Sequence, residues 1–205
     1  MKRKNFKYLI GIDEVGRGPI AGPVAVGAFI FLSPTATKNF KKIKESKQLS
    51  EEKREEWFGK IIVEQKKGLV DFIVTFQSEK VIDTKGLSFA IKNALKISIN
   101  NLVKKNNLKL NEVKVLLDGG LKAPIEYLNQ KTIIKGDEKE KAIALASICA
   151  KVLRDRKMRK WAKKYPGYGF EVNKGYGTKG HYEAIEKYGL TNLHRRSFLK
   201  GNQYM

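Results

Sequence analysis

The sequence predicts an α/β fold in which a mixed β-sheet is flanked by helices and followed by a small helical C-terminal extension. Two β-type runs near the N-terminus are joined by a stretch too rich in glycine and proline to be helical. Further strand-like runs then alternate with long helical segments. No internal repeat, and no linker that would separate two large domains, interrupts the 205 residues.

Five short runs rich in branched and aromatic residues predict the strands of the sheet. They cover residues 8–12, 23–32, 69–76, 113–117 and 132–134. The connection between the first two, residues 16–23, reads Gly-Arg-Gly-Pro-Ile-Ala-Gly-Pro. Because this composition is typical of a turn, the first two strands are expected to pair as a β-hairpin.

Four segments predict helices that cover the sheet, namely residues 50–67, 80–105, 137–164 and 181–188. The first begins at Ser50, which precedes Glu51 and Glu52 as at a typical helix N-terminus. The remaining residues, 165–205, are rich in glycine, tyrosine and basic side chains. We therefore expect residues 1–164 to form the main domain and residues 165–205 an extension packed on it.

The charge balance predicts a polyanionic partner. Lysine and arginine number 42 against 21 acidic residues, which gives a formal net charge of +21. A field of this sign and size favours nucleic acid or an acidic membrane face as the partner. The lysines are spread along the whole chain, so part of the excess is expected to be a solvated surface.

The single cysteine and the N-terminus favour the cytoplasm. Cys149 has no partner within the chain and lies among alanine and isoleucine, so it is expected to be a small core residue. The first apolar run is interrupted by Asp13, Glu14 and Arg17, which is unlike a signal peptide. No stretch approaches the length of a transmembrane span.

Four carboxylates stand where predicted strands end or where a helix begins. Asp13 and Glu14 follow the first strand, Asp118 follows the fourth, and Asp137 opens the longest helix. If the first and fourth strands are parallel neighbours, their acidic ends lie side by side. Clustered carboxylates repel one another unless a cation is present, and hard divalent ions prefer such oxygen ligands. The pattern indicates a metal site.

Each acid also has a structural interpretation that the residues alone leave open. Asp118 precedes two glycines and is compatible with a turn. Asp137, with Glu140 three positions later, is compatible with a helix capping box. Adjacent strand residues point to opposite faces, so Asp13 and Glu14 reach one site only if the strand bends or ends there, which Gly16 permits.

Several motifs in the same order resemble the ribonuclease HII family over about residues 8–199. The matching segments are Gly11-Ile12-Asp13-Glu14-Val15-Gly16-Arg17-Gly18-Pro19, Glu45-Ser46-Lys47-Gln48-Leu49, Leu117-Asp118-Gly119, Lys135-Gly136-Asp137, residues 146–155, residues 173–178, His181 and residues 194–198. Glu45 and the pair Gly86-Leu87 depart from the family pattern, which has Asp and Asn-Ile there, and neither departure touches a metal-ligand position.

The resemblance implies a ribonuclease H-like fold and a metal-dependent endonuclease. It implies that Asp13, Glu14, Asp118 and Asp137 are catalytic and ligate two Mg²⁺ or Mn²⁺ ions. The implied substrates are RNA/DNA hybrids and duplex DNA containing single ribonucleotides, cut on the 5′ side of the ribonucleotide to leave a 3′-hydroxyl and a 5′-phosphate. The C-terminal extension is then a substrate-binding part.

Recognition of the sugar is expected to involve the glycine-rich loop and a tyrosine. Glycines let the backbone of Gly16, Arg17 and Gly18 approach a 2′-hydroxyl, although a simple turn between two strands has the same composition. The resemblance implies that Tyr176 hydrogen-bonds the 2′-hydroxyl and stacks on the next, deoxy, sugar. Tyr176 is otherwise compatible with a packing role.

Basic residues within these motifs are expected to contact phosphates without reading sequence. They are Arg17, Lys47, Lys151 and Arg154. His181 and His194 are expected to be structural or to lie near phosphates. No membrane partner is expected, the chain is expected to be a monomer, and a sliding-clamp partner is left open by the sequence.

Three other functions compete with this one. A metal-independent ribonuclease would use His181 and His194 as an acid–base pair and leave the four acids idle. A non-catalytic nucleic-acid-binding protein would gain nothing from acids that face phosphate. The sister family, ribonuclease HIII, has an extra N-terminal domain and usually lacks arginine in the Gly-x-Gly loop, whereas this chain has Arg17 there.

Overall fold

The computed structural model describes residues 6–41, 43 and 49–199, and its centre is a five-stranded mixed sheet. The strands are β1 (Tyr8–Val15), β2 (Val24–Phe31), β3 (Val70–Gln77), β4 (Val113–Asp118) and β5 (Gln130–Ile133). Their order is β3-β2-β1-β4-β5. β1 pairs with β2 in antiparallel fashion, which confirms the hairpin, and with β4 in parallel, which places the ends of β1 and β4 at one edge.

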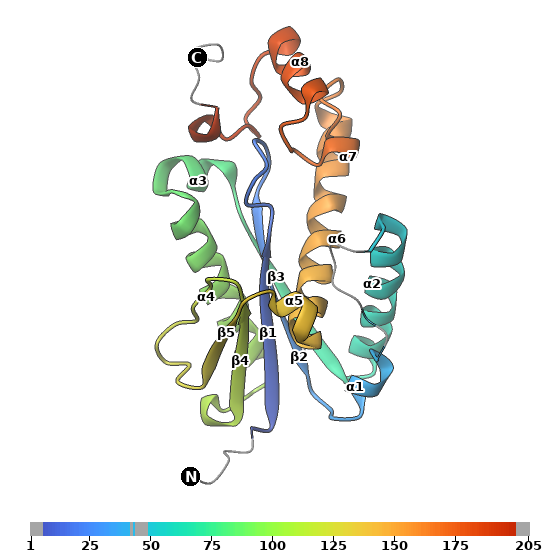
Figure 1. The fold of residues 1–205 in the computed structure, drawn as a ribbon, viewed down its shortest axis with the longest axis vertical. Coiled ribbons are helices and arrows are strands. Elements are labelled where there is room, and N and C mark those ends of the chain that lie inside the picture. Colours follow the sequence, from blue (N-terminus) through green and yellow to red (C-terminus); the bar gives the residue numbers. More distant parts are fainter. Residues whose placement is uncertain (1–5, 42, 44–48, 200–205) are drawn as a thin grey trace.

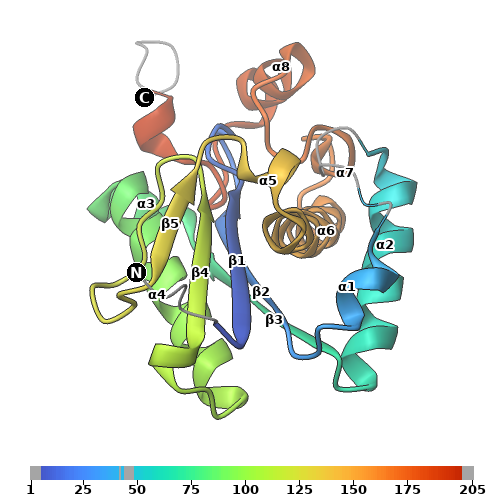
Figure 2. The same cartoon turned by 60° about the horizontal axis from the view of Figure 1, so that its bottom comes forward.

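Helices cover both faces of this sheet, as the sequence predicted (Figures 1 and 2). One face packs against α6 (Lys141–Lys164), with α2 (Glu51–Lys66) and α1 (Ala36–Asn39) outside it. The other face packs against α4 (Leu87–Lys105), which α3 (Glu79–Lys85) precedes. Each face has its own apolar core, and the buried Cys149 belongs to the core under α6.

Two segments predicted to be helical are each divided in the structure. The segment 80–105 divides at Gly86, whose φ of 85° lies outside the helical region and separates α3 from α4. The segment 137–164 divides at Glu140, which is extended and separates α5 (Gly136–Lys139) from α6. The start at Ser50 is confirmed, because its side chain accepts a hydrogen bond from the Lys53 N–H.

The C-terminal residues lie beyond the edge of the sheet where the β1–β2 hairpin turns (Figure 1). They contain α7 (Phe170–Asn173), α8 (Lys179–Tyr188) and a short 3-10 turn (Arg196–Phe198). Outside this region, another 3-10 turn (Leu110–Glu112) precedes β4. Backbone hydrogen bonds join this region to the hairpin connection, from Ile20 N–H to Gly175 O and from Gly22 N–H to Leu193 O. No helix in the described ranges has the length and apolarity to cross a membrane.

Close packing of α6 on the sheet requires a glycine in β2. A Cβ atom at Gly27 would lie 2.4 Å from the backbone oxygen of Ala146 in α6. We therefore expect Gly27→Ala to lower the free energy of unfolding by roughly 1–3 kcal/mol, as overpacking does.

Gly59→Ala is the matched control, since Gly59 lies in α2 and a Cβ atom added there would have no described atom within 4 Å. Alanine is the better helix former, so this change is expected to stabilise by roughly 0.5–1 kcal/mol. Denaturant unfolding measures both variants. A Gly27→Ala protein as stable as the wild type would contradict the close approach of α6.

Candidate active site

The carboxyl ends of β1 and β4 form one wall of a cleft of about 390 Å³. Most of the side chains and loop residues singled out in the sequence meet there. The cleft is lined by Asp13, Glu14, Gly16, Arg17, Gly18, Asp118, Lys151 and Tyr176, together with Val15, Arg54 and Ser147. Residues from opposite ends of the chain therefore share one site.

Asp13 and Glu14 reach this cleft from opposite faces of β1. Asp13 faces α6, where the Ser147 hydroxyl hydrogen-bonds its carboxylate. The Glu14 carboxylate is half-buried, and its Oε1 accepts a hydrogen bond from Arg17 Nη1 at 2.8 Å. Both side chains line one cleft because β1 ends at Val15 and Gly16 turns the chain with a φ of 90°.

Asp118 and Asp137 are brought together by a hydrogen bond across 18 residues. Asp118 Oδ1 accepts from the Gly136 N–H at 2.6 Å, which fixes the start of α5 beside the end of β4. The adjacent Asp137 is buried and lies close enough to raise the pKa of Asp13. The capping-box interpretation of Asp137 is wrong, since the N-cap position of α5 is Lys135, and Glu140 stands at the N-cap position of α6 without a side-chain capping bond.

The electrostatics of this cluster favour a bound cation. Burial, and after it the neighbouring carboxylates of Glu14, Asp118 and Asp137, raises the pKa of the Asp13 carboxyl to about 8, against the hydrogen bond from Ser147. Burial also raises the pKa of Glu14, while Arg17 lowers it. Keeping Asp13 ionised at neutral pH without a counter-charge is therefore unfavourable.

The residues suit a hard divalent cation in chemistry. All four are carboxylates, the preferred ligands of Mg²⁺ and Mn²⁺. Glu14 Oε2 is buried and has no hydrogen-bond partner among the described residues. In the described ranges, however, no three His, Cys, Asp or Glu side chains are already arranged to hold a metal ion. Binding would therefore draw the carboxylates together from their present positions.

A positively charged rim faces the acids across the cleft. Lys151 lies one turn after Ser147 on α6, and its ammonium contacts the Asp155 carboxylate at 2.8 Å. Burial lowers the pKa of Lys151, which lines the cleft beside Arg54 of α2. Arg54 Nη2 lies 4.0 Å from the same Asp155, so the two basic side chains share one buried carboxylate. This rim suits a phosphate group.

Two residues that were not predicted from the sequence, Ser147 and Arg54, also line the cleft. A hydroxyl among the apolar and alanine side chains of residues 142–150 was a usable signal for Ser147. No such signal marks Arg54 in the sequence, because only the packing of α2 on α6 brings it to the cleft. Lys47, predicted to contact phosphate, lies outside the described residues.

Arg154 does not contact phosphate, and that expectation is wrong. Its guanidinium is fully buried and donates to the backbone oxygens of Pro23 at 2.9 Å and Lys174 at 3.0 Å. A third, longer hydrogen bond reaches Ala21 O. Arg154 therefore joins α6 to the hairpin connection and to the segment before Tyr176.

His181 and His194 are structural. Both are buried, their Nε2 atoms lie 3.1 Å apart, and both rings pack against Phe170. Burial lowers the pKa of His194 to about 4. Neither lines the cleft with the carboxylates, so they do not form an acid–base pair there.

The glycine-rich loop and Tyr176 lie side by side on the open side of the cleft. A Cβ atom at Gly18 would stand 3.8 Å from Cε1 of the Tyr176 ring. Tyr176 is 43% exposed, so its ring is accessible to a ligand. A second cleft begins on the other side of Arg17 and is lined by Ser88, Lys92 and Lys122.

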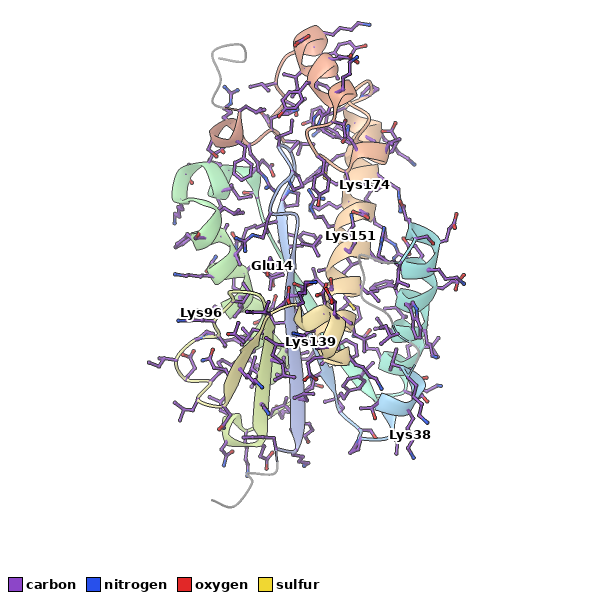
Figure 3. All side chains as sticks on the ribbon, viewed as in Figure 1. Glu14, Lys38, Lys96, Lys139, Lys151 and Lys174 are labelled. Atoms are coloured by element: carbon purple, nitrogen blue, oxygen red, sulfur yellow. The ribbon has the colours of Figure 1, made fainter. Side chains whose placement is uncertain are left out.

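Basic side chains also extend over elements on both sides of the sheet. Figure 3 labels Lys38 on α1, Lys96 on α4 and Lys139 on α5, all exposed, whereas Lys151 lines the cleft and Lys174, at the end of α7, is buried. The charge thus includes both a solvated surface and a rim around the site.

Comparisons with known proteins agree on one family. The model of the family described as Ribonuclease HII matches residues 10–201. The ribonuclease HII of Clostridium beijerinckii is 44% identical over 196 residues, covering 95% of this chain and 68% of the relative. That of Caldicellulosiruptor bescii is 42% identical over 197 residues, covering 96% and 89%.

Solved structures agree on the fold. The ribonuclease H2 of Pyrococcus horikoshii superposes with a TM-score of 0.71 at 24% identity, covering 95% of this chain and all of that one. A ribonuclease HIII named Bst-RNase HIII, solved in complex with Mn²⁺, gives a TM-score of 0.65 at 21% identity, covering 96% and 70%.

Proposed function

The chain belongs to the ribonuclease HII family and is a ribonuclease H-type hydrolase that acts on RNA/DNA hybrids, and from this premise we propose its finer activity. We propose that it also cuts duplex DNA on the 5′ side of an embedded ribonucleotide by two-metal-ion hydrolysis. The observation that carries the proposal is the set of acids around Asp13, whose pKa burial and neighbouring carboxylates raise to about 8.

Asp13, Glu14, Asp118 and Asp137 are the proposed ligands of two Mg²⁺ or Mn²⁺ ions. Two such ions, when bound, stabilise the attacking and leaving oxygens of an in-line displacement at phosphorus. Water adds to phosphorus, the bond to the upstream 3′-oxygen breaks, and that oxygen takes a proton. The products are a 3′-hydroxyl on the upstream strand and a 5′-phosphate on the ribonucleotide.

The remaining residues of the cleft place the substrate. Ser147 holds the Asp13 carboxylate, and Lys151 with Arg54 offers positive charge to a phosphate. Arg17 lines both clefts, and Lys92 and Lys122 add positive charge to the second. We assign phosphates of the cut strand to the first cleft, and a duplex substrate explains why a basic surface continues beyond it.

The sugar is proposed to be read by the Gly16–Gly18 loop and by Tyr176. The two lie side by side on one cleft and come from the two parts of the chain proposed as units, residues 1–164 and 165–205. A tyrosine ring stacked on the next deoxy sugar leaves no room for another 2′-hydroxyl there. The C-terminal extension would then supply part of the preference for RNA–DNA junctions.

The reaction class is tested by removing the metal. A hybrid with a labelled RNA strand should be cut in Mg²⁺ or Mn²⁺, left intact in excess chelator, and cut again when the ion is restored. Cleavage that persists in chelator and leaves 2′,3′-cyclic phosphate ends would refute the proposal. An intact strand under every condition, with tight binding, would instead favour the non-catalytic alternative.

A further inference from the structure

Arg195 is fully buried beneath the glycine-rich loop and uses its whole guanidinium to hold backbone oxygens. Nη2 donates to Gly16 O at 2.7 Å, and Nη1 donates to Arg17 O at 2.9 Å. Nε donates to Gly22 O at 2.8 Å. One side chain from the C-terminal extension thus fixes two successive peptide units of the loop and the far end of the same connection.

These hydrogen bonds determine where the N–H groups of the loop point. In a trans peptide unit the C=O and N–H bonds point in opposite directions, and the described chain has no cis peptide bonds. Because the Gly16 and Arg17 carbonyls point at the buried guanidinium, the N–H groups of Arg17 and Gly18 point away from it. Neither N–H hydrogen-bonds another described residue, and both residues are exposed along the cleft.

The backbone around Arg195 holds its side chain in place. Its own N–H donates to Ile20 O at 2.7 Å. The next two N–H groups, of Arg196 and Ser197, donate to the Asp83 carboxylate of α3 at 2.9 and 3.0 Å. The position of the guanidinium is therefore determined by α3 and by the hairpin connection together.

We infer that Arg195 is a positioning residue that turns the N–H groups of Arg17 and Gly18 into a two-donor site for the 2′-oxygen of the ribonucleotide. This inference rests on the proposed sugar recognition and specifies that the loop donates the hydrogen bonds. Its carbonyls are not available as acceptors, since they are engaged by Arg195. A deoxynucleotide leaves these donors without an acceptor. The loop thereby distinguishes ribose from deoxyribose by donating hydrogen bonds to the 2′-oxygen. The guanidinium keeps the loop rigid enough for this distinction.

Binding in chelator, where no strand is cut, isolates this effect. Fluorescence anisotropy gives Kd for an all-DNA duplex and for the same duplex with one ribonucleotide. Arg195→Lys keeps the charge but lacks the planar fork that reaches three carbonyls. It should reduce the wild-type preference for the ribonucleotide duplex, the ratio of the two Kd values, by about 10-fold, because neutral hydrogen bonds contribute roughly 1 kcal/mol each. If the wild-type ratio is less than about 10, the variant should have no preference.

Two further variants keep the inference falsifiable. Asp83→Ala releases the segment that carries Arg195 without changing a buried residue of the loop, and it should lower the preference in the same direction. Phe40→Leu, in the distant core under α1, is the control with a comparable loss of stability and should leave the preference unchanged.

The outcomes separate the inference from the proposed function. Equal weakening on both duplexes by Arg195→Lys and Asp83→Ala would overturn it and leave Arg195 a merely structural residue. A wild-type protein that does not distinguish the two duplexes would remove the proposed sugar recognition, and this inference with it. A Phe40→Leu protein that also loses the preference would likewise refute a specific role for Arg195.

Discussion

Asp13→Asn is expected to reduce cleavage of a hybrid at least about 1000-fold while substrate binding stays unchanged or becomes tighter. The loss follows because a metal ligand is removed, and a metal ion provides several kcal/mol of transition-state stabilisation, each 1.36 kcal/mol being tenfold in rate. Binding does not weaken, because the change removes a negative charge that faces phosphate. Single-turnover cleavage and equilibrium binding measure the two effects separately.

Asp71→Asn is a matched control for this variant. Asp71 is also a buried aspartate, on β3, where it accepts hydrogen bonds from Gln65, Lys105 and Asn106 far from the cleft. This change is expected to lower stability and leave the activity of the folded protein intact. Near-full activity of Asp13→Asn or of Asp118→Asn would show that the metal assignment is wrong.

The pH dependence of stability gives Asp13→Asn a second readout. Folding raises the pKa of Asp13 from 3.8 to about 8, so without metal the folded protein binds the proton more tightly than the unfolded chain. The wild type should therefore lose stability as pH rises from about 4 to about 8. Asp13→Asn should lose less over the same range, which thermal unfolding in chelator measures.

Tyr176→Ala is expected to reduce cleavage at a single embedded ribonucleotide by on the order of 100-fold, with its metal ions still bound. The variant loses a sugar contact and a positioning contact, and a small misplacement of the scissile phosphate is enough for a loss of this size. Tyr176→Phe keeps the ring and removes only the hydroxyl, so its activity should fall between that of the wild type and that of Tyr176→Ala.

Continuous RNA in a hybrid provides the comparison for Tyr176. There the next sugar carries its own 2′-hydroxyl, so the ring stacks poorly even in the wild type and its removal should matter less. The measurement is the ratio of junction to hybrid cleavage for the wild type and both variants. Equal losses on the two substrates would make Tyr176 a structural residue and leave the junction preference without this explanation.

The parts of the fold set by local pattern were predictable from the sequence. All five strands and the hairpin are present. The parallel pairing of the first and fourth strands, which the sequence left as a condition, is present as well. The helix breaks at Gly86 and Glu140 were missed, because the apolar stripe of each segment begins after its break and periodicity carries no information before it.

The site residues that lie in sequence motifs were predictable, whereas those whose position depends on tertiary contacts were not. Asp13, Glu14 and Asp118 do share a cleft, and Gly16 does end the strand as expected. The buried role of Arg154 could not be predicted, since a basic residue on a helix is usually exposed. Two of its hydrogen bonds run to residues more than a hundred positions earlier in the chain.

The central claim is tested most directly by mapping the cut in a DNA duplex that contains one ribonucleotide, labelled at either end and incubated with Mg²⁺. Metal-ion hydrolysis at the cleft predicts one cut on the 5′ side, with a 3′-hydroxyl on the upstream DNA and a 5′-phosphate on the ribonucleotide. A cut on the 3′ side that leaves a 2′,3′-cyclic phosphate, or a duplex that stays intact, would contradict the account.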